Sequence, residues 1–126
     1  MTTNLTDLTV TSLTINGYAI VAPAVKALTG NGTITSADAG VVTLNKTTGA
    51  ITVTLTAPTA VTDDGKCLMF VSLNNVSHVI NMAGGFGNGG NGEDVCTFSA
   101  VVGNALHLIA WGGYWYIVGN HQGTIA

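Results

Sequence analysis

The stretch Ile51-Thr52-Val53-Thr54-Leu55-Thr56 alternates an apolar and a polar residue at every step. Successive side chains of an extended strand point to opposite faces, so Ile51, Val53 and Leu55 share one face and the threonines share the other. β-Branched residues such as these also fit the pleated surface of a strand. The stretch therefore predicts a half-buried β-strand.

The strand pattern extends to both sides of this stretch. Val41–Asn45 precedes it, and the intervening Lys46-Thr47-Thr48-Gly49 predicts a β-hairpin that pairs the two segments. Downstream, Cys67–Leu73 is apolar on both faces, which predicts a central strand of a sheet. Gly112-Gly113 predicts a tight hairpin turn between two further strands, since glycine adopts positive φ without strain. Upstream, Val25–Leu28 predicts a single helical turn.

The remaining predicted strands are short. They lie at Thr33–Thr35, Ser77–Met82, Val95–Ala100, Leu106–Trp111 and Tyr114–Val118. About eight to nine strands, with turns about every 8–12 residues, are typical of antiparallel sandwiches and barrels. We therefore predict an all-β fold, a sandwich or jelly-roll-like domain over residues 18–126.

Residues 1–17 precede this domain and contain two similar units. Leu8-Thr9-Val10 and Leu13-Thr14-Ile15 follow one another and end at Asn16-Gly17. Two units are too few for a solenoid repeat, so the segment predicts a short extended β arm. Its apolar residues alternate in a segment too short to fold alone, which predicts contacts with another chain. These contact residues are Leu5, Leu8, Val10, Leu13 and Ile15.

Charged residues are scarce along the whole chain. They make up 7% of the 126 residues, against about 25% in typical soluble domains. A solitary soluble protein normally carries many charges that keep it dispersed. Here Thr, Asn, Ser and Gly take their place, and these residues satisfy hydrogen bonds at little desolvation cost on burial. Such a surface is suited to extensive contacts between subunits.

The charge balance also disfavours several classes of partner. With three lysines, no arginine and a net charge of −3, the chain lacks the cations that phosphate contacts need, so we expect no nucleic acid. No apolar run approaches the roughly 20 residues of a membrane-spanning helix. The start, Met1–Asn4, lacks the basic and apolar regions of a signal peptide, so we expect synthesis in a cytoplasm without export.

A glycine-rich segment over Ala83–Gly92 contains two motif matches. Gly87–Gly92 fits GxGxxG, but a predicted strand follows it, so there is no helix N-terminus to hold a pyrophosphate. Gly89–Asp94 matches one calcium-binding GGxGxD unit, with Glu93 and Asp94 as the candidate ligands. That motif binds calcium in tandem copies. We interpret the segment as an exposed loop, or as a loop ordered by a neighbouring subunit, and we expect no metal and no cofactor.

The sequence contains no recognisable catalytic grouping. His78, His107 and His121 show no metal-binding spacing, and the serines lack a GxSxG elbow. Cys67 and Cys96 form no CxxC motif, and both a pair of reduced strand residues and a disulfide fit their positions. We therefore expect a non-enzymatic protein.

Four aromatic residues, Trp111, Tyr114, Trp115 and Tyr116, gather near the C-terminus. In a strand, Tyr114 and Tyr116 share one face while Trp115 takes the other. At least one of these faces therefore belongs to the core or to a subunit interface. The alternative role for the aromatic side chains is a platform on which a glycan stacks.

Two segments carry a resemblance to a known group of proteins. They are TITSADAGVVTLN (Thr33–Asn45) and LHLIAWGGYWYIV (Leu106–Val118), together with the lead-in Leu8–Gly17. They resemble structural proteins of tailed bacteriophages, namely head-decoration, head-fibre and fibre-tip domains. The resemblance implies a homotrimer on the outside of a virion, with an N-terminal segment that attaches and a C-terminal β domain that projects.

On this resemblance we expect a capsid decoration or head-fibre protein, made in the host cytoplasm and located on the capsid surface. Its partners are then further copies of the chain and the major capsid protein. The alternative is a receptor-binding fibre tip, with a host surface glycan as the partner and the four aromatic residues as its site. An enzyme comes third, because it needs a pocket in which His78 or His107 meets an acid.

Overall fold

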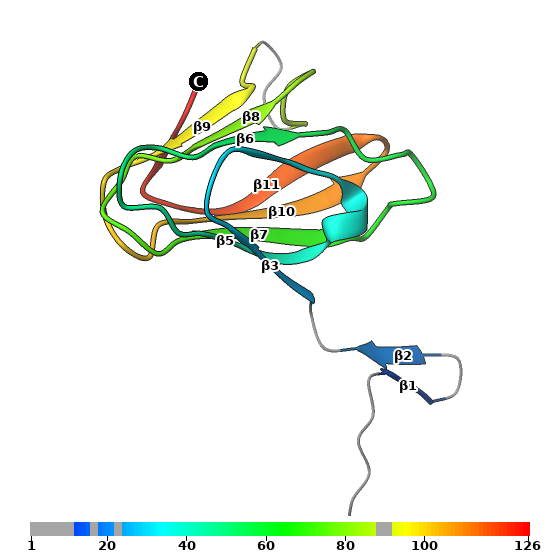
Figure 1. The fold of residues 1–126 in the computed structure, drawn as a ribbon. Coiled ribbons are helices and arrows are strands. Elements are labelled where there is room, and N and C mark those ends of the chain that lie inside the picture. The colour runs from blue at the N-terminus through cyan, green and yellow to red at the C-terminus, as the bar shows by residue number, and fades with distance from the viewer. Residues whose placement is uncertain (1–11, 16–17, 22–23, 88–91) are drawn as a thin grey trace, which may run out of the picture.

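The computed structural model describes residues 12–15, 18–21, 24–87 and 92–126. Within them the chain is all-β, as the alternating pattern predicts, and a 3-10 turn at Ser36–Asp38 is the one helical element described. Ten strands form two sheets of five, so of the two predicted arrangements the structure is the sandwich (Figure 1).

The first sheet has the order β11-β10-β7-β5-β3 and is called the β7 sheet after its central strand. Its strands are β3 (Ala24–Leu28), β5 (Gly40–Leu44), β7 (Cys67–Ser72), β10 (Ala105–Trp111) and β11 (Tyr114–His121). The second sheet, the β8 sheet, has the order β12-β9-β8-β6-β4. Its strands are β4 (Gly32–Ile34), β6 (Thr52–Leu55), β8 (Val79–Met82), β9 (Val95–Phe98) and β12 (Gly123–Ile125).

Between β3 and β8 the chain winds as a coil. Each turn of the coil gives one strand to the β7 sheet and the next strand to the β8 sheet. Consequently β3, β5 and β7 run parallel to one another, and so do β4, β6 and β8. The last four strands then add to both sheets in antiparallel pairs.

This winding overturns the predicted hairpin between Val41–Asn45 and Ala50–Thr56. The two strands, β5 and β6, lie in different sheets and each pairs in parallel with strands of the neighbouring turns. The alternating pattern shows which residues face the core. It does not show which strand is the partner, because two strands of one hairpin and two strands of facing sheets have the same pattern. The helical turn predicted at Val25–Leu28 is also wrong, because these residues belong to β3 and pair with β5.

The core lies between the sheets and is built from residues in register. Ile34, Leu55 and Met82 are opposite one another on β4, β6 and β8, and all are buried. On the facing sheet Val42 of β5 is opposite Phe70 of β7, again without exposed surface. Each strand of the coil therefore stacks its apolar residues on those of the turn before, which buries them without a helix.

The two ion pairs described both fix connections between the sheets. Lys26 Nζ lies 3.0 Å from Asp38 Oδ1, beside the 3-10 turn that precedes β5. Lys66 Nζ lies 2.8 Å from Asp63 Oδ1, while Asp63 Oδ2 accepts the Thr59 N–H at 2.7 Å. The Lys66 hydrogen bond and then the Thr59 N–H lower the pKa of Asp63 to about 2. Each of these ion pairs thus stabilises a connection in which the chain crosses from one sheet to the other.

A separate two-stranded sheet precedes the sandwich. It pairs β1 (Ser12–Ile15) with β2 (Tyr18–Val21) in antiparallel register (Figure 1). The β arm predicted over residues 1–17 thus overlaps β1, and the described sandwich begins at Ala24.

Replacement of Leu55 tests the stacked core. Leu55→Ala removes a buried side chain that lies in register between Ile34 and Met82, so we expect the free energy of unfolding to fall by about 2–5 kcal/mol. Thr54→Val, one residue away on the outer face of the same strand, is the control and should change it by less than about 0.5 kcal/mol. Urea unfolding measures both, and equal effects of the two variants would contradict the stacked arrangement.

Candidate functional site

The predicted aromatic cluster lies on the β10–β11 hairpin, which turns through Gly112 and Gly113 as predicted. Both glycines have positive φ, at 59° and 87°. Trp115 is fully buried in the core, and its Nε1–H donates to the Thr56 carbonyl at 2.9 Å. Trp111 and Tyr114 remain 64% and 49% exposed. The cluster is thus divided, with one residue inside the sandwich and its neighbours at the surface.

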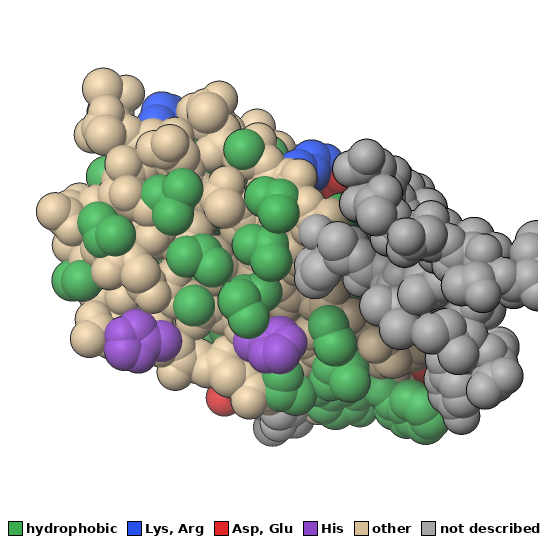
Figure 2. Space-filling model, turned by 90° about the horizontal axis from the view of Figure 1, so that it is seen from below, with side chains coloured by type: hydrophobic (Ala, Val, Ile, Leu, Met, Phe, Trp, Pro, Cys, Tyr) green, Lys and Arg blue, Asp and Glu red, His purple; other side chains and the backbone are tan. Residues whose placement is uncertain are grey.

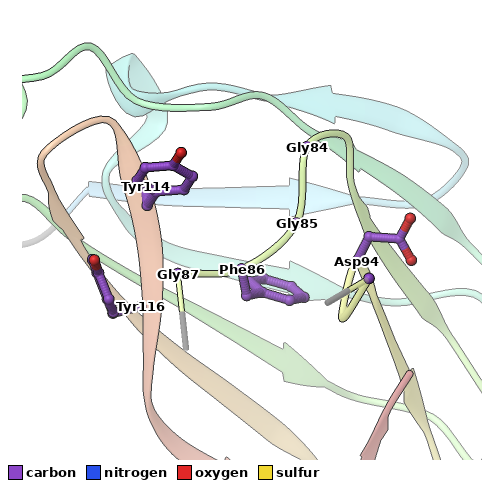
Figure 3. A pocket seen from close by; sticks show the side chains of 8 residues that line it. Gly84, Gly85, Phe86, Gly87, Asp94, Tyr114 and Tyr116 are labelled. Carbon is purple, nitrogen blue, oxygen red and sulfur yellow. The ribbon is translucent and has the colours of Figure 1, made fainter. Parts of the chain in front are cut away.

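A cavity of about 390 Å³ lies beside the two tyrosines of this cluster. The segment Gly84–Gly87, which follows β8, forms its floor, and Tyr114 and Tyr116 come from β11 on one side of this floor (Figure 3). Asp94 lines it from the other side, and Gly92 is also among the lining residues. We call this cavity the tyrosine pocket.

The floor of the tyrosine pocket is held at three points. Phe86 is 2% exposed and packs in the core. Its N–H donates to the Glu93 carbonyl at 2.8 Å, and the Gly87 N–H donates to the Trp115 carbonyl at 2.9 Å. The segment is therefore attached both to the connection that precedes β9 and to the edge strand β11.

Gly87 permits a close approach between the floor and Tyr116. A Cβ at position 87 would lie 2.6 Å from the Cζ of the Tyr116 ring, which is shorter than any normal contact. Only glycine therefore lets the ring lie against the backbone of the floor. Sequence reasoning found both the glycine-rich segment and the tyrosines, but no sequence signal joins residues about 30 positions apart.

The predicted metal candidates are adjacent residues of this region. Asp94 is exposed and lines the tyrosine pocket, whereas Glu93 is half-buried and is not among the lining residues. Among the described residues, no three His, Cys, Asp or Glu side chains form a group that could hold a metal ion.

The outer face of the β7 sheet is a second candidate surface. Along β7 and β10 every second residue is buried, so Met69 and His107 lie on the outer face, directly opposite each other. None of the outward positions on the five strands of the β7 sheet carries a lysine or a carboxylate. We call the following set the apolar face: Val25, Ala27, Val41, Thr43, Cys67, Met69, Val71, Ala105, His107, Ile109, Trp111, Tyr114, Tyr116 and His121. Figure 2 shows hydrophobic side chains gathered on this side of the molecule, with histidines beside them.

The outer face of the β8 sheet has a different composition. Its outward positions are Thr33, Thr52, Thr54, Val79, Asn81, Val95, Thr97 and Thr124. Threonine and asparagine side chains keep such a face hydrated by hydrogen bonds. The two faces of the sandwich therefore differ in their affinity for water, although neither carries a charged side chain.

The histidines predicted as single residues lie in different environments. His78 has no exposed surface, and its Nδ1 accepts the Ile51 N–H at 2.9 Å. Burial, and to a lesser degree the charge of Lys46, hold the pKa of His78 below its usual 6.5. His107 belongs to the apolar face and His121 is exposed near the end of β11.

The two cysteines are both free. Cys67 is exposed on β7 and Cys96 is buried on β9, in the other sheet. Burial raises the pKa of the Cys96 thiol to about 11, which disfavours the reactive thiolate. Of the two possibilities left by the sequence, the structure has the reduced pair.

The predicted contact residues of the N-terminal segment are only partly within the described structure. Leu13 and Ile15 are two positions apart on β1. Leu5, Leu8 and Val10 lie outside the described residues.

Comparisons with protein-family models, with curated proteins and with solved structures give no match for this chain. No helix in the described part of the chain is long and apolar enough to cross a membrane. The fold itself defines an all-β sandwich whose first six strands are wound as a coil.

The buried histidine makes a prediction about pH. Protonation would put a hydrogen on Nδ1, the atom that accepts the Ile51 N–H, so the folded protein resists it more than the unfolded chain. Stability should be complete above about pH 6.5 and should fall as the pH decreases from there through the lower folded-state pKa. Urea unfolding at about pH 7.5 and about pH 5.5 measures this loss.

Two variants assign the effect to His78. His78→Asn retains an acceptor for the Ile51 N–H but does not titrate, so the loss of stability between the two pH values should shrink. His107→Gln, on the apolar face, should leave this loss of stability unchanged. An unchanged pH dependence in His78→Asn would contradict the assignment.

Proposed function

We propose that this protein is a structural component of a bacteriophage virion, a capsid decoration or head-fibre protein that acts by association rather than by catalysis. In this role it forms a homotrimer, binds the major capsid protein on the capsid exterior and stabilises the particle. The observation that carries the proposal is the contrast between the apolar face and the threonine-rich face of the same sandwich.

The apolar face is of a size that favours contact with another protein. Five strands about 4.8 Å apart, each with about six residues at about 3.3 Å, span roughly 500 Å². Patches of this size on soluble proteins are often functional, and a standard interface buries about 800 Å² on each partner. The apolar face would therefore supply more than half of the area that one partner buries, and loops or the N-terminal segment would supply the rest.

The scarcity of charge supports the same proposal. A lysine or carboxylate within an interface must lose its hydration, which costs several kcal/mol unless it is paired. The outward positions of the β7 sheet need no such compensation, and in each described ion pair the carboxylate lies in a connection. The assignment to a phage particle, beyond association in general, rests on the resemblance of Thr33–Asn45 and Leu106–Val118 to phage structural proteins.

A charge on the apolar face tests self-association. Met69→Glu introduces a carboxylate on the central strand of the β7 sheet, so we expect the dissociation constant of the oligomer to rise by at least about 100-fold. Asn81→Glu, on the central strand of the β8 sheet, is the matched control and should leave the oligomer intact. Native mass spectrometry and sedimentation measure the assembly. A monomeric wild-type protein, or an unchanged oligomer in Met69→Glu, would contradict the proposed interface.

Removal of the N-terminal segment tests attachment to the capsid. A chain without residues 2–21 lacks β1, β2 and the predicted contact residues, but it keeps all ten strands of the sandwich. We expect it to melt cooperatively and to lose binding to purified capsids in a co-sedimentation assay. Binding equal to that of the full chain would count against attachment through this segment.

A further inference from the structure

We infer that the tyrosine pocket binds the terminal sugar of an uncharged glycan. This inference goes beyond the proposed function, because it concerns a small-molecule ligand at the border of the apolar face, where Tyr114 and Tyr116 belong to both, and it holds whether or not the chain is part of a virion. Three features of the pocket carry it: the aromatic side, the glycine floor and the single carboxylate.

The aromatic side has the chemistry that sugar rings require. The C–H face of a pyranose packs on an aromatic ring, and the tyrosine hydroxyl adds a hydrogen-bonding group at the edge of the ring. Tyr114 is 49% exposed, so much of its side chain is open to a ligand. Tyr116 is held against Gly87, where no side chain could be inserted. One ring is therefore accessible, and the other lies directly against the floor.

The floor offers polar backbone without covering side chains. Gly84, Gly85 and Gly87 contribute only main chain to the pocket, so a hydroxyl-rich ligand can approach the backbone closely. The hydrogen bonds of Phe86 and Gly87 to Glu93 and Trp115 attach this floor at both ends. A floor fixed in advance lowers the entropy lost when a ligand binds.

Asp94 lines the side opposite the tyrosines, and Figure 3 shows its carboxylate turned away from them. Its backbone is held on both sides, since its N–H donates to the Ala126 carbonyl at 2.9 Å and its carbonyl accepts the Met82 N–H at 2.7 Å. A carboxylate can accept hydrogen bonds from two hydroxyl groups, and such charge-assisted bonds are about twice as strong as neutral ones. Asp94 thus offers such bonds to hydroxyl groups on the side of the pocket away from the tyrosines.

The charge of the lining residues narrows the class of glycan. Asp94 is the charged residue of the lining, and no lysine lies among the described lining residues. Sialylated and phosphorylated sugars bring a negative charge and find no cation there, so repulsion disfavours them. A metal ion is also disfavoured as the ligand, because one carboxylate is too few for a stable site. The volume of about 390 Å³ lies in the usual range of small-molecule sites and accommodates a hexose ring.

The experiment uses the full chain on an array that carries neutral, amino, sialylated and phosphorylated glycans. We expect binding to the neutral sugars and none to the anionic ones. The glycan with the strongest signal is then titrated against the wild type by calorimetry and by saturation-transfer NMR.

Variants locate the binding at the pocket. Tyr114→Ala and Asp94→Asn should each weaken binding by about tenfold or more. Glu93→Gln removes the neighbouring charge outside the lining, and Trp111→Ala removes an exposed aromatic residue of the same hairpin, so both controls should leave the affinity within about twofold. Thermal melting confirms that each variant is folded, and native mass spectrometry follows the oligomer separately.

The inference fails if no neutral glycan binds at millimolar concentration, or if charged glycans bind best. It also fails if Tyr114→Ala and Asp94→Asn, both folded, bind as the wild type does. If the wild-type protein binds the glycan but is a monomer, the result counts against the proposed function and not against this inference. Trp115→Ala is unsuitable as a test, because Trp115 is buried and its loss would unsettle the core.

Discussion

The parallel hydrogen-bonded ladders between successive turns of the coil are the constraint on which the rest of the structure depends. They align β3 with β5 and β7, and β4 with β6 and β8. In the β7 sheet the ladders continue past the ends of the strands. There the Asn45 N–H donates to the Leu28 carbonyl and the Leu73 N–H donates to the Leu44 carbonyl, both at 2.9 Å. Because each turn repeats the course of the one before, apolar residues fall into register in the interior. The outward positions fall into register as well, and this creates two continuous faces of different composition.

The sequence predicts the inward and outward positions better than it predicts the partners of each strand. The buried side of Ile51-Thr52-Val53-Thr54-Leu55-Thr56 is the apolar side, since the pleat of a strand leaves no other choice. The Gly112-Gly113 hairpin is also predictable, because two consecutive positive φ angles favour glycine. The parallel pairing of β5 with β7 is not, because it joins segments 28 residues apart across a strand of the other sheet. No local signal distinguishes that connection from a hairpin.

The candidate surfaces show the same limit of sequence reasoning. Alternation separates Trp115 from Tyr114 and Tyr116, and the structure has Trp115 in the core with its indole N–H bonded to the Thr56 carbonyl. The alternating pattern cannot predict that the segment after β8 lies against β11, because that contact depends on how the two sheets face each other. The apolar face is equally hidden: its residues come from five strands, and each strand alone contains only two to four outward positions.

The edges of the two sheets bear on how copies of the chain could associate. Exposed edge strands invite pairing with other chains, and proteins block them with short strands, charges or covering loops. Here β4 and β12 have three residues each, and β3 carries Lys26, whose ammonium group binds Asp38. The remaining edge strand, β11, is partly covered by Gly87, whose N–H donates to the Trp115 carbonyl. With every described edge short, charged or covered, contact through a sheet face is favoured over edge pairing. The apolar face is then the surface that such a contact would use, while the tyrosine pocket, formed where the floor segment meets β11, would stay at its border.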